Sequence, residues 1–489
     1  MYYSKEILEV AKLDIEQRKE VEINASELEI QKNYIKKIKE INNIEFSKSE
    51  KQKLYTLVTY GCQMNSHDSE KISGMLTEMG FKETNDENLA DVIVYNTCCV
   101  RENAENKIYG NLGFLKGLKA KNKDLKIVLC GCMMQQDLVI DKIKSSYKYV
   151  DVIFGTYNLY RFPELLYTSI ETKGQIIDVW KEHGEIIEDL PSIRLHPFKA
   201  SVNIMFGCNN FCTYCIVPYV RGRERSREVS DIIREVKKLI DDGVKEVTLL
   251  GQNVNSYGKT LDTPVSFASL LLKISEIEGL ERIRFMTSHP KDLSDELIQV
   301  IKNCDKVCKH LHLPFQSGSN KILKKMGRNY TKESYLQLID KIKKEIPNIS
   351  FTTDIIVGFP TETDEDNNET ISLVKDVMFS NAFTFLYSTR SGTPAANLKE
   401  QVQEHKAKER FNKLLDVLKP ISYEVSKQQV GTIQKALVEN ISKNDNELLS
   451  GRLDNNMIVH FKGDASLIGQ IINIKIIDCK TFYLIGEKL

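Results

Sequence analysis

The stretch "FGCNNFCTYC", residues 206–215, decides how the larger part of this chain is organised. It spaces Cys208, Cys212 and Cys215 as C-x-x-x-C-x-x-C, directly after the strand candidate "ASVNIMF". A short loop of this spacing can hold a [4Fe–4S] cluster through three of its irons and leave the fourth iron open to a small molecule. A thioredoxin-like pair or half of a zinc site would need only the last two cysteines. The third cysteine and the place after a strand favour the cluster.

Outward from this loop, strand and helix patterns alternate through residues 194–422. Helices are expected between the strands, near residues 229–241, 266–278, 292–303, 331–345 and 364–378. This order predicts a partial (β/α)6 barrel, whose chemistry gathers at the carboxyl ends of the strands. The six strand candidates are "ASVNIMF", "EVTLLG", "RIRFMTS", "KHLHLPF", "FTTDIIVGF" and "AFTFLYS".

A second α/β series occupies residues 53–170, with strand candidates "YTLVTY", "DVIVYN", "KIVLC" and "VDVIFG". The alternation predicts a doubly wound parallel sheet. In three of these strands a cysteine follows a valine by four residues, which gives Cys62, Cys98 and Cys132. Aligned on those valines, three thiols reach one edge of the sheet and could bind a second [4Fe–4S] cluster with an open iron. Cys99 and Cys130 fall outside this alignment and are expected to point away from the cluster.

Two other readings of these three cysteines stay open. Structural zinc is the rival metal, although it usually takes four protein ligands. Buried cysteines also serve as small apolar side chains without any chemistry.

The two ends of the chain differ from its middle. Residues 1–52 are rich in Lys and Glu and are expected to form a charged extension of one or two solvated helices, or a partly disordered arm. Residues 423–489 hold short β segments split by Gly, Asn and Asp, which predicts a small all-β barrel of OB type. Residues 171–195 read as a connector.

Composition limits the classes of function. The formal net charge of the 489 residues is zero, so a nucleic-acid partner must be bound by a local patch. With 11 cysteines and neither a signal peptide nor a long apolar run, we expect a cytoplasmic protein with metal or redox chemistry and no membrane attachment.

The cysteine loop resembles that of the radical S-adenosylmethionine (SAM) enzymes. That resemblance implies that SAM binds the open iron and is cleaved to an adenosyl radical. It also implies cofactor contacts at Tyr214, at Gly251 and Gln252 in "LLGQNVNSYG", and at Ile356 and Gly358 in "DIIVGFPTET". Tight strand-to-helix turns are the alternative reading for the two glycines.

From residue 53 to the end the chain is similar to the methylthiotransferases, which carry an auxiliary [4Fe–4S] cluster, a radical-SAM core and a TRAM domain. "TYGCQMNSHDSEKISGML", "NTCCVRENAENK", "GCMMQQ", "RFMTSHP" and "HLPFQSGS" resemble the tRNA branch of MiaB type. This resemblance implies methylthio transfer to carbon 2 of dimethylallyl (isopentenyl) adenosine at position 37, beside the tRNA anticodon. It also implies that two SAM molecules are used per turnover, one as methyl donor and one as radical source.

Alternative substrates are threonylcarbamoyladenosine of tRNA and a ribosomal protein. The ribosomal-protein branch typically has Pro-Lys after its first cysteine, and the threonylcarbamoyl branch has a Lys-Val type pair. Gln63-Met64 stand there in this chain. A rival of another class is a non-catalytic, zinc-dependent RNA-binding protein.

The expected partners are the tRNA anticodon stem-loop and an electron donor such as flavodoxin or ferredoxin, with the protein acting as a monomer. Arg101 follows Cys98 by three residues and begins the helix after it, so it is expected near the cofactor cavity. For RNA contact the best local patch is "YVRGRERSRE", because arginine suits phosphate binding and base stacking. The alternative is a solvated loop whose arginines pair with Glu224 and Glu228. It contains Arg221, Arg223, Arg225 and Arg227.

Overall fold

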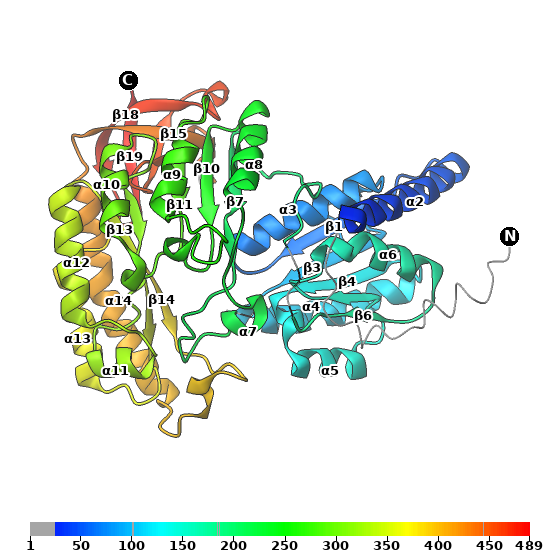
Figure 1. The fold of residues 1–489 in the computed structure, drawn as a ribbon, viewed down its shortest axis with the longest axis horizontal. Coiled ribbons are helices and arrows are strands. Elements are labelled where there is room, and N and C mark those ends of the chain that lie inside the picture. Colours follow the sequence, from blue (N-terminus) through cyan, green and yellow to red (C-terminus); the bar gives the residue numbers. More distant parts are fainter. Residues whose placement is uncertain (1–24, 100–101, 183, 185, 444) are drawn as a thin grey trace. The chain divides into compact units, whose positions relative to one another are not determined.

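The computed structural model describes residues 25–99, 102–182, 184, 186–443 and 445–489 (Figure 1). Its contacts divide the chain into two units. Unit 1 runs to Leu195 and also includes the separate segment Ile216–Gly222. Unit 2 comprises His196–Cys215 and Arg223–Leu489. The residue expected near the cofactor cavity, Arg101, lies outside the described residues.

Unit 1 is built on a parallel sheet of six strands in the order β2-β1-β3-β4-β5-β6. Its last strand lies beyond residue 170, so the stretch expected as a connector supplies the edge of this sheet. The strands are β1 (Leu54–Thr59), β2 (Lys82–Glu83), β3 (Val92–Thr97), β4 (Lys126–Gly131), β5 (Val152–Phe154) and β6 (Ile176–Asp178).

Helices cover both faces of this sheet. Successive β3 residues alternate between two apolar clusters, since Ile93 faces one and Val94 the other. One face packs against α4 (Glu102–Lys121) and α5 (Asp137–Ser146). The other packs against α3 (Gln63–Glu78) and α6 (Phe162–Glu171). This confirms the doubly wound fold.

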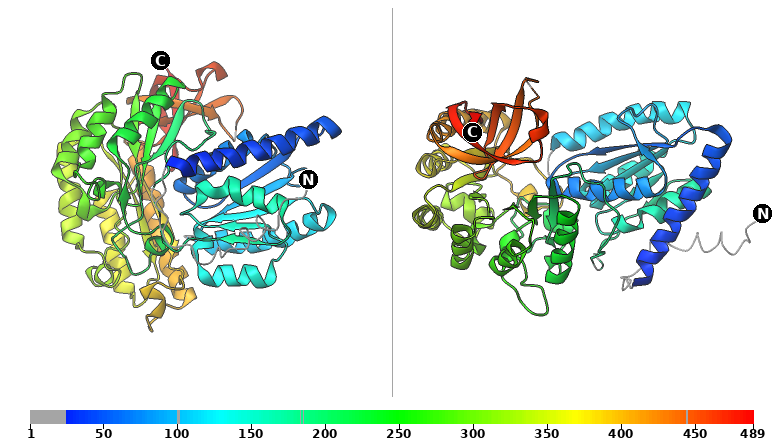
Figure 2. Two further views of the ribbon diagram at one scale, coloured as in Figure 1. Left: turned by 45° about the vertical axis from the view of Figure 1, so that its right-hand side comes forward. Right: turned by 90° about the horizontal axis from the view of Figure 1, so that it is seen from above.

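The N-terminal extension contributes a helix to unit 1. α2 (Ala25–Ser49) lies along α6 (Figure 2). Ile38 is fully buried, and the Asn42 amide donates a hydrogen bond of 2.9 Å to the carbonyl oxygen of Met79. The described half of the extension is therefore a helix, as one of the two expectations had it, but it packs into the domain and is not simply solvated.

Unit 2 begins with six parallel strands in chain order, arranged as two sheets of three. An isolated parallel bridge between Ile283 and Val307 joins the sheets. All six expected strands are present, which confirms the partial barrel. They are β7 (Lys199–Asn203), β10 (Glu246–Leu250), β11 (Arg282–Phe285), β12 (His310–His312), β13 (Ser350–Val357) and β14 (Asn381–Leu386).

The helices of unit 2 carry their apolar stripes onto these strands, and their buried residues join one large core cluster. They are α8 (Val229–Asp241), α9 (Phe267–Ser275), α10 (Asp295–Asn303), α12 (Lys332–Glu345), α13 (Asp364–Val377) and α14 (Glu404–Lys427). The short α11 (Asn320–Lys325) follows β12.

The C-terminal strands form a closed barrel in the order β15-β16-β17-β19-β18, as expected. Two arginines of β11 attach this barrel to the core. Arg282 donates to the carbonyl oxygens of Arg452 and Lys435, and Arg284 donates to that of Leu453. The barrel strands are β15 (Ile433–Ile441), β16 (Leu448–Leu453), β17 (Ile458–Lys462), β18 (Ile471–Cys479) and β19 (Tyr483–Lys488).

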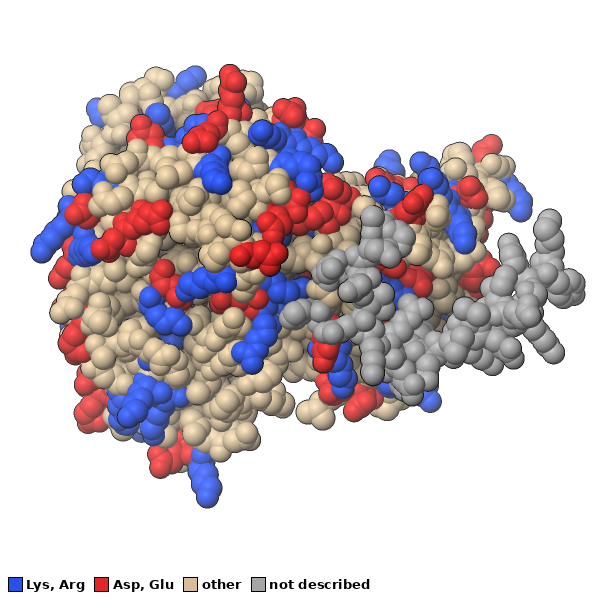
Figure 3. Space-filling view, viewed as in Figure 1, with Lys and Arg blue, Asp and Glu red and all other residues tan. Residues whose placement is uncertain are grey.

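None of the helices in the described part of the chain is both long enough and apolar enough to cross a bilayer. On the face seen in Figure 3, Lys and Arg side chains are interspersed with Asp and Glu side chains, in keeping with the zero net charge.

Candidate functional site

In unit 1 the strand register brings two of the three expected cysteines level with each other. Thr97 of β3 pairs with Gly131 of β4, so Cys98 and Cys132 are the next residues beyond the same edge. Both cysteines are buried. Parallel strands present their carboxyl ends at one edge, which is where open α/β sheets bind ligands.

The alignment of the third strand was wrong by one residue. Leu57, and not Val58, pairs with Val94. Cys62 therefore lies one residue further beyond the edge than Cys98, at the N-cap of α3, where it is exposed. A valine-to-valine alignment cannot detect this offset, because register is set by side-chain packing across the sheet.

Gly61 and Asn65 shape the space around these thiols. Gly61 has φ +107°, and a Cβ on it would lie 2.6 Å from the Cys98 sulfur, so only glycine lets this thiol approach the end of β1. The buried Asn65 amide donates to the carbonyl oxygens of Tyr60 (2.9 Å) and Thr97 (2.8 Å). It thereby ties together the carboxyl ends of β1 and β3. Neither role has a signature in sequence spacing.

Cys99 does not point away from this edge, as the alignment led us to expect. Its thiol is hydrogen-bonded to that of Cys132, which lowers the pKa of Cys132 and raises that of Cys99. The reason is that β3 ends at Thr97, so the alternation of side chains no longer applies two residues later. Cys130, within β4, packs in the cluster on the opposite face, as expected.

Arg221 comes to this edge from the short helix α7 (Val217–Arg221), which belongs to unit 1. Its guanidinium is buried. Nη2 donates to Asn65 Oδ1 (2.7 Å) and Asp68 Oδ2 (2.8 Å), and Nε donates to Cys132 Sγ (3.2 Å). This placement argues against the RNA contact expected for Arg221.

In unit 2 the cysteine loop follows β8 (Met205–Phe206) and is fixed through Thr213, which lies between its last two cysteines. The amide of Thr213 donates to Met326 O (2.9 Å), its hydroxyl donates to Lys325 O (2.8 Å), and its carbonyl accepts from the amide of Ala395 (2.9 Å). Burial raises the pKa of the Cys208 thiol to about 11. Binding to a metal would displace that proton.

Two of the expected cofactor contacts meet beside this loop. Tyr214 and Ile356 pack against one small apolar cluster formed by Ile322, Met326, Phe359 and Ala395. Gly358, with φ +79°, follows β13, and a Cβ there would lie 2.7 Å from that of Ala407. Gly251 follows β10, where a Cβ would lie 2.6 Å from Met205 Cγ, and Gln252 is half-buried next to it.

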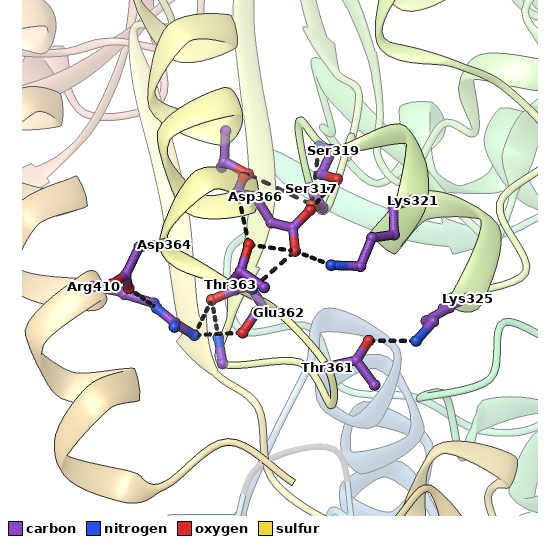
Figure 4. Close-up of polar contacts among 12 residues, drawn as sticks. Ser317, Ser319, Lys321, Lys325, Thr361, Glu362, Thr363, Asp364, Asp366 and Arg410 are labelled. Carbon is purple, nitrogen blue, oxygen red and sulfur yellow. Dashed lines mark hydrogen bonds and ion pairs between the residues drawn. The ribbon is translucent and has the colours of Figure 1, made fainter. Parts of the chain in front are cut away.

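The turn after β13 is held by carboxylates. Glu362 accepts a hydrogen bond from the Gly358 amide (3.0 Å), and burial raises the pKa of Glu362 to about 7. Asp366 accepts from Ser319 and from Lys321, both at 2.7 Å (Figure 4). These contacts fix the segment that the resemblance assigns to adenosine.

Arg328 was not singled out from the sequence. This buried arginine donates from Nη1 to Cys212 Sγ (3.8 Å) and from Nη2 to Pro314 O (2.5 Å), while Nε donates to the Tyr330 hydroxyl (2.9 Å). A lone arginine far from the cysteine loop carries no signal in spacing. Only the fold brings it to the thiol.

The remaining arginines of the patch differ in exposure. Arg223 is exposed and lies 4.2 Å from the centroid of the Phe211 ring, while Arg225 is half-buried and lies 5.8 Å from that of Phe206. Arg227 is buried and donates to Asn203 O (2.5 Å). Arg223 and Arg225 therefore stay candidates for RNA, and the burial of Arg227 argues against it.

Within the described residues, no three His, Cys, Asp or Glu side chains gather around a single metal position. This does not conflict with a cubane, because its cysteines bind three different irons and the cluster separates their sulfurs. Both sets offer three thiols and a buried arginine beside one of them, which suits a cluster of net negative charge.

Buried polar atoms in the core also suit a polar cofactor. Asn203, Asn255 and Ser288 lie at or just after the carboxyl ends of β7, β10 and β11. Each has side-chain atoms without a hydrogen-bond partner among the described residues. Such atoms are costly unless a ligand or water satisfies them.

Comparison with known proteins gives three family models along the chain. The radical SAM superfamily matches residues 202–374, the uncharacterized protein family UPF0004 matches residues 54–155, and the TRAM domain matches residues 427–489. The solved structure of TsrM, a radical S-adenosylmethionine methyltransferase from Kitasatospora setae, is similar with a TM-score of 0.50 and 14% identity. That alignment covers 79% of this chain and 81% of the other, and it supports the fold alone.

Two curated relatives are named tRNA-2-methylthio-N(6)-dimethylallyladenosine synthase. The relative from Alkaliphilus oremlandii (strain OhILAs) is 58% identical, over 89% of this chain and 93% of its own length. The relative from Acetivibrio thermocellus (strain ATCC 27405) is 54% identical, over 96% of this chain and 98% of its own length. This chain therefore belongs to the tRNA-2-methylthio-N(6)-dimethylallyladenosine synthase family, within the radical SAM superfamily.

Proposed function

We propose that this protein adds a methylthio group to carbon 2 of N6-dimethylallyladenosine at position 37 of tRNA. The observation that carries the proposal is identity above 50% to synthases of this name over about nine-tenths of the chain or more. Membership of the radical SAM superfamily implies SAM and a [4Fe–4S] cluster, and the family is one of tRNA modification.

Cys208, Cys212 and Cys215 would hold the cluster that binds SAM. When bound, this cluster and SAM supply one-electron chemistry, which suits a C–H bond that is too weakly acidic for any side chain to deprotonate. Ile356 and Gly358 would contact the cofactor's adenosine, and Tyr214, which packs against the same apolar cluster as Ile356, would contact the cofactor beside them. Gly251 and Gln252 after β10 are assigned to its methionine part.

Cys62, Cys98 and Cys132 would hold a second, auxiliary [4Fe–4S] cluster with an open iron that can carry sulfur. This set is supported by the strand register, which places Cys98 and Cys132 side by side just beyond the carboxyl ends of β3 and β4. Two SAM molecules are then used per turnover, one as methyl donor and one as radical source.

The tRNA would be bound through its anticodon stem-loop, whose unstacked bases can enter a pocket. Arg223 and Arg225 are the proposed phosphate or stacking contacts, and the C-terminal barrel adds a surface fixed to the core by Arg282 and Arg284. We further propose a monomer that works in the cytoplasm and receives electrons from a flavodoxin or ferredoxin.

Two measurements test this proposal. After anaerobic purification the chain should hold about eight irons, two clusters of four. Transfer RNA nucleosides from a strain lacking the gene should lose 2-methylthio-dimethylallyladenosine and regain it on complementation. Unchanged nucleosides would refute the substrate, and a colourless protein that binds zinc would refute the chemistry.

A further inference from the structure

One buried guanidinium connects the segment after the SAM cluster loop with the edge proposed to bind the auxiliary cluster. Arg221 lies six residues after Cys215 in the chain. Residues 216–222 nevertheless belong to unit 1, and α7 ends with this arginine at the edge formed by β3 and β4. A single stretch, residues 208–221, thus holds three thiols for one cluster and a cation for the other.

The contacts of Arg221 fix both its position and its orientation. Three hydrogen bonds leave from Nε and Nη2, and their acceptors are a thiol, an amide oxygen and a carboxylate. Arg221 as a residue is 5% exposed. Burying a guanidinium is costly unless it is paired, and here the partners include the proposed cluster ligand itself.

The neighbours of this arginine exclude two simpler roles. A phosphate of RNA could not reach a side chain this deeply buried. A purely structural ion pair would need only Asp68, whereas the Nε–H group is directed at the Cys132 sulfur at 3.2 Å. Hydrogen bonds to ligand sulfurs and nearby charge are among the features that set the reduction potential of iron–sulfur clusters.

We propose that Arg221 is a positioning residue for the auxiliary cluster and that it raises the reduction potential of this cluster through the hydrogen bond to Cys132. The inference rests on the auxiliary cluster of the proposed function. Reduction adds one electron from an external donor and breaks no bond. The reduced cluster carries one more negative charge, so a fixed cation beside its ligand stabilises it more than the oxidised form.

The test isolates the auxiliary cluster in the full-length chain by replacing Cys208, Cys212 and Cys215 with alanine. Iron per chain is measured first. The reduction potential is then measured by redox titration followed by electron paramagnetic resonance, for this parent and for Arg221→Gln, Arg221→Lys and Asp68→Asn made in it. Arg223→Gln is the matched control, because that arginine is exposed and belongs to unit 2.

We expect Arg221→Gln to shift the reduction equilibrium at least tenfold toward the oxidised cluster, which is about 59 mV for one electron. Arg221→Lys should recover most of that shift, because it keeps the charge. Asp68→Asn should shift the equilibrium in the opposite direction, and Arg223→Gln should leave it unchanged.

An unchanged potential in Arg221→Gln, or equal losses in the Gln and Lys variants, would overturn the role of Arg221 while leaving the auxiliary cluster in place. A parent that holds no iron would instead overturn the auxiliary cluster. If the Gln variant loses its iron, the Lys variant decides: iron and potential near those of the parent support the inference, and loss of iron overturns it.

Discussion

Replacing Arg284 with methionine should loosen the attachment of the C-terminal barrel to the core. This arginine is 8% exposed and forms an ion pair of 3.0 Å with Glu246, which is 3% exposed. It also donates to the carbonyl oxygens of Leu453 (2.7 Å) and Asp454 (3.3 Å), where the barrel strand β16 ends. Methionine keeps most of the volume but leaves a buried carboxylate without its nearest cation.

The expected loss of stability follows from the buried Glu246 carboxylate, which stays behind without its nearest cation. Removing one partner of a buried ion pair costs about 3–5 kcal/mol. Arg282 still lies 3.7 Å from Glu246, so we expect the lower end, about 3 kcal/mol, or roughly a hundredfold in the opening equilibrium. The double variant Arg284→Met with Glu246→Leu should recover most of this loss, because it removes the unpaired charge.

Hydrogen exchange measured by mass spectrometry resolves this effect by segment. Amides of β15 and β16 should exchange roughly a hundredfold faster in Arg284→Met, while those of unit 1 stay unchanged. Arg234→Met is the control, since this side chain is 52% exposed and its ion pair with Asp231 is worth little. If Arg284→Met lowers the free energy of opening by less than about 1 kcal/mol, or if the double variant is no more stable than the single one, the reasoning is refuted.

Three further outcomes are expected. Cys98→Ala should lower iron from about eight to about four per chain, whereas Cys99→Ala should keep about eight; the reverse pattern in iron analysis would reject Cys98 as the ligand. The pKa of Glu362 is about 7 in the folded protein, against 4.5 ordinarily, so the folded state holds this proton more tightly than the unfolded state. The free energy of unfolding should therefore fall by about 3 kcal/mol as pH rises from 4.5 through 7. Thermal unfolding of Glu362→Gln should lack this fall. Arg223→Ala should weaken tRNA binding and reduce the slope of log affinity against log salt concentration by about 1. An unchanged slope would show that Arg223 does not contact the RNA. Arg227→Ala should instead lower the unfolding temperature.

The sequence by itself determined the architecture and predicted the two sets of cysteines. The core strands are short runs rich in apolar and β-branched residues, with helical patterns between them, so the existence of each strand is a local property. The spacing of Cys208, Cys212 and Cys215 is local in the same sense. Their place after the first core strand could therefore be read without knowledge of any distant contact.

Only the tertiary structure decided which neighbours these residues acquire. "YVRGRERSRE" spaces its arginines evenly, yet they differ in burial. Arg221 is buried because residues 216–222 pack into unit 1, Arg227 is buried where it donates to Asn203 O, and Arg223 is exposed. The offset of β1, the contact of Cys99 with Cys132 and the approach of Arg328 to Cys212 arise in the same way. Spacing along the chain fixes local geometry, whereas partners far apart in sequence are selected by packing and by the need to pair buried charge.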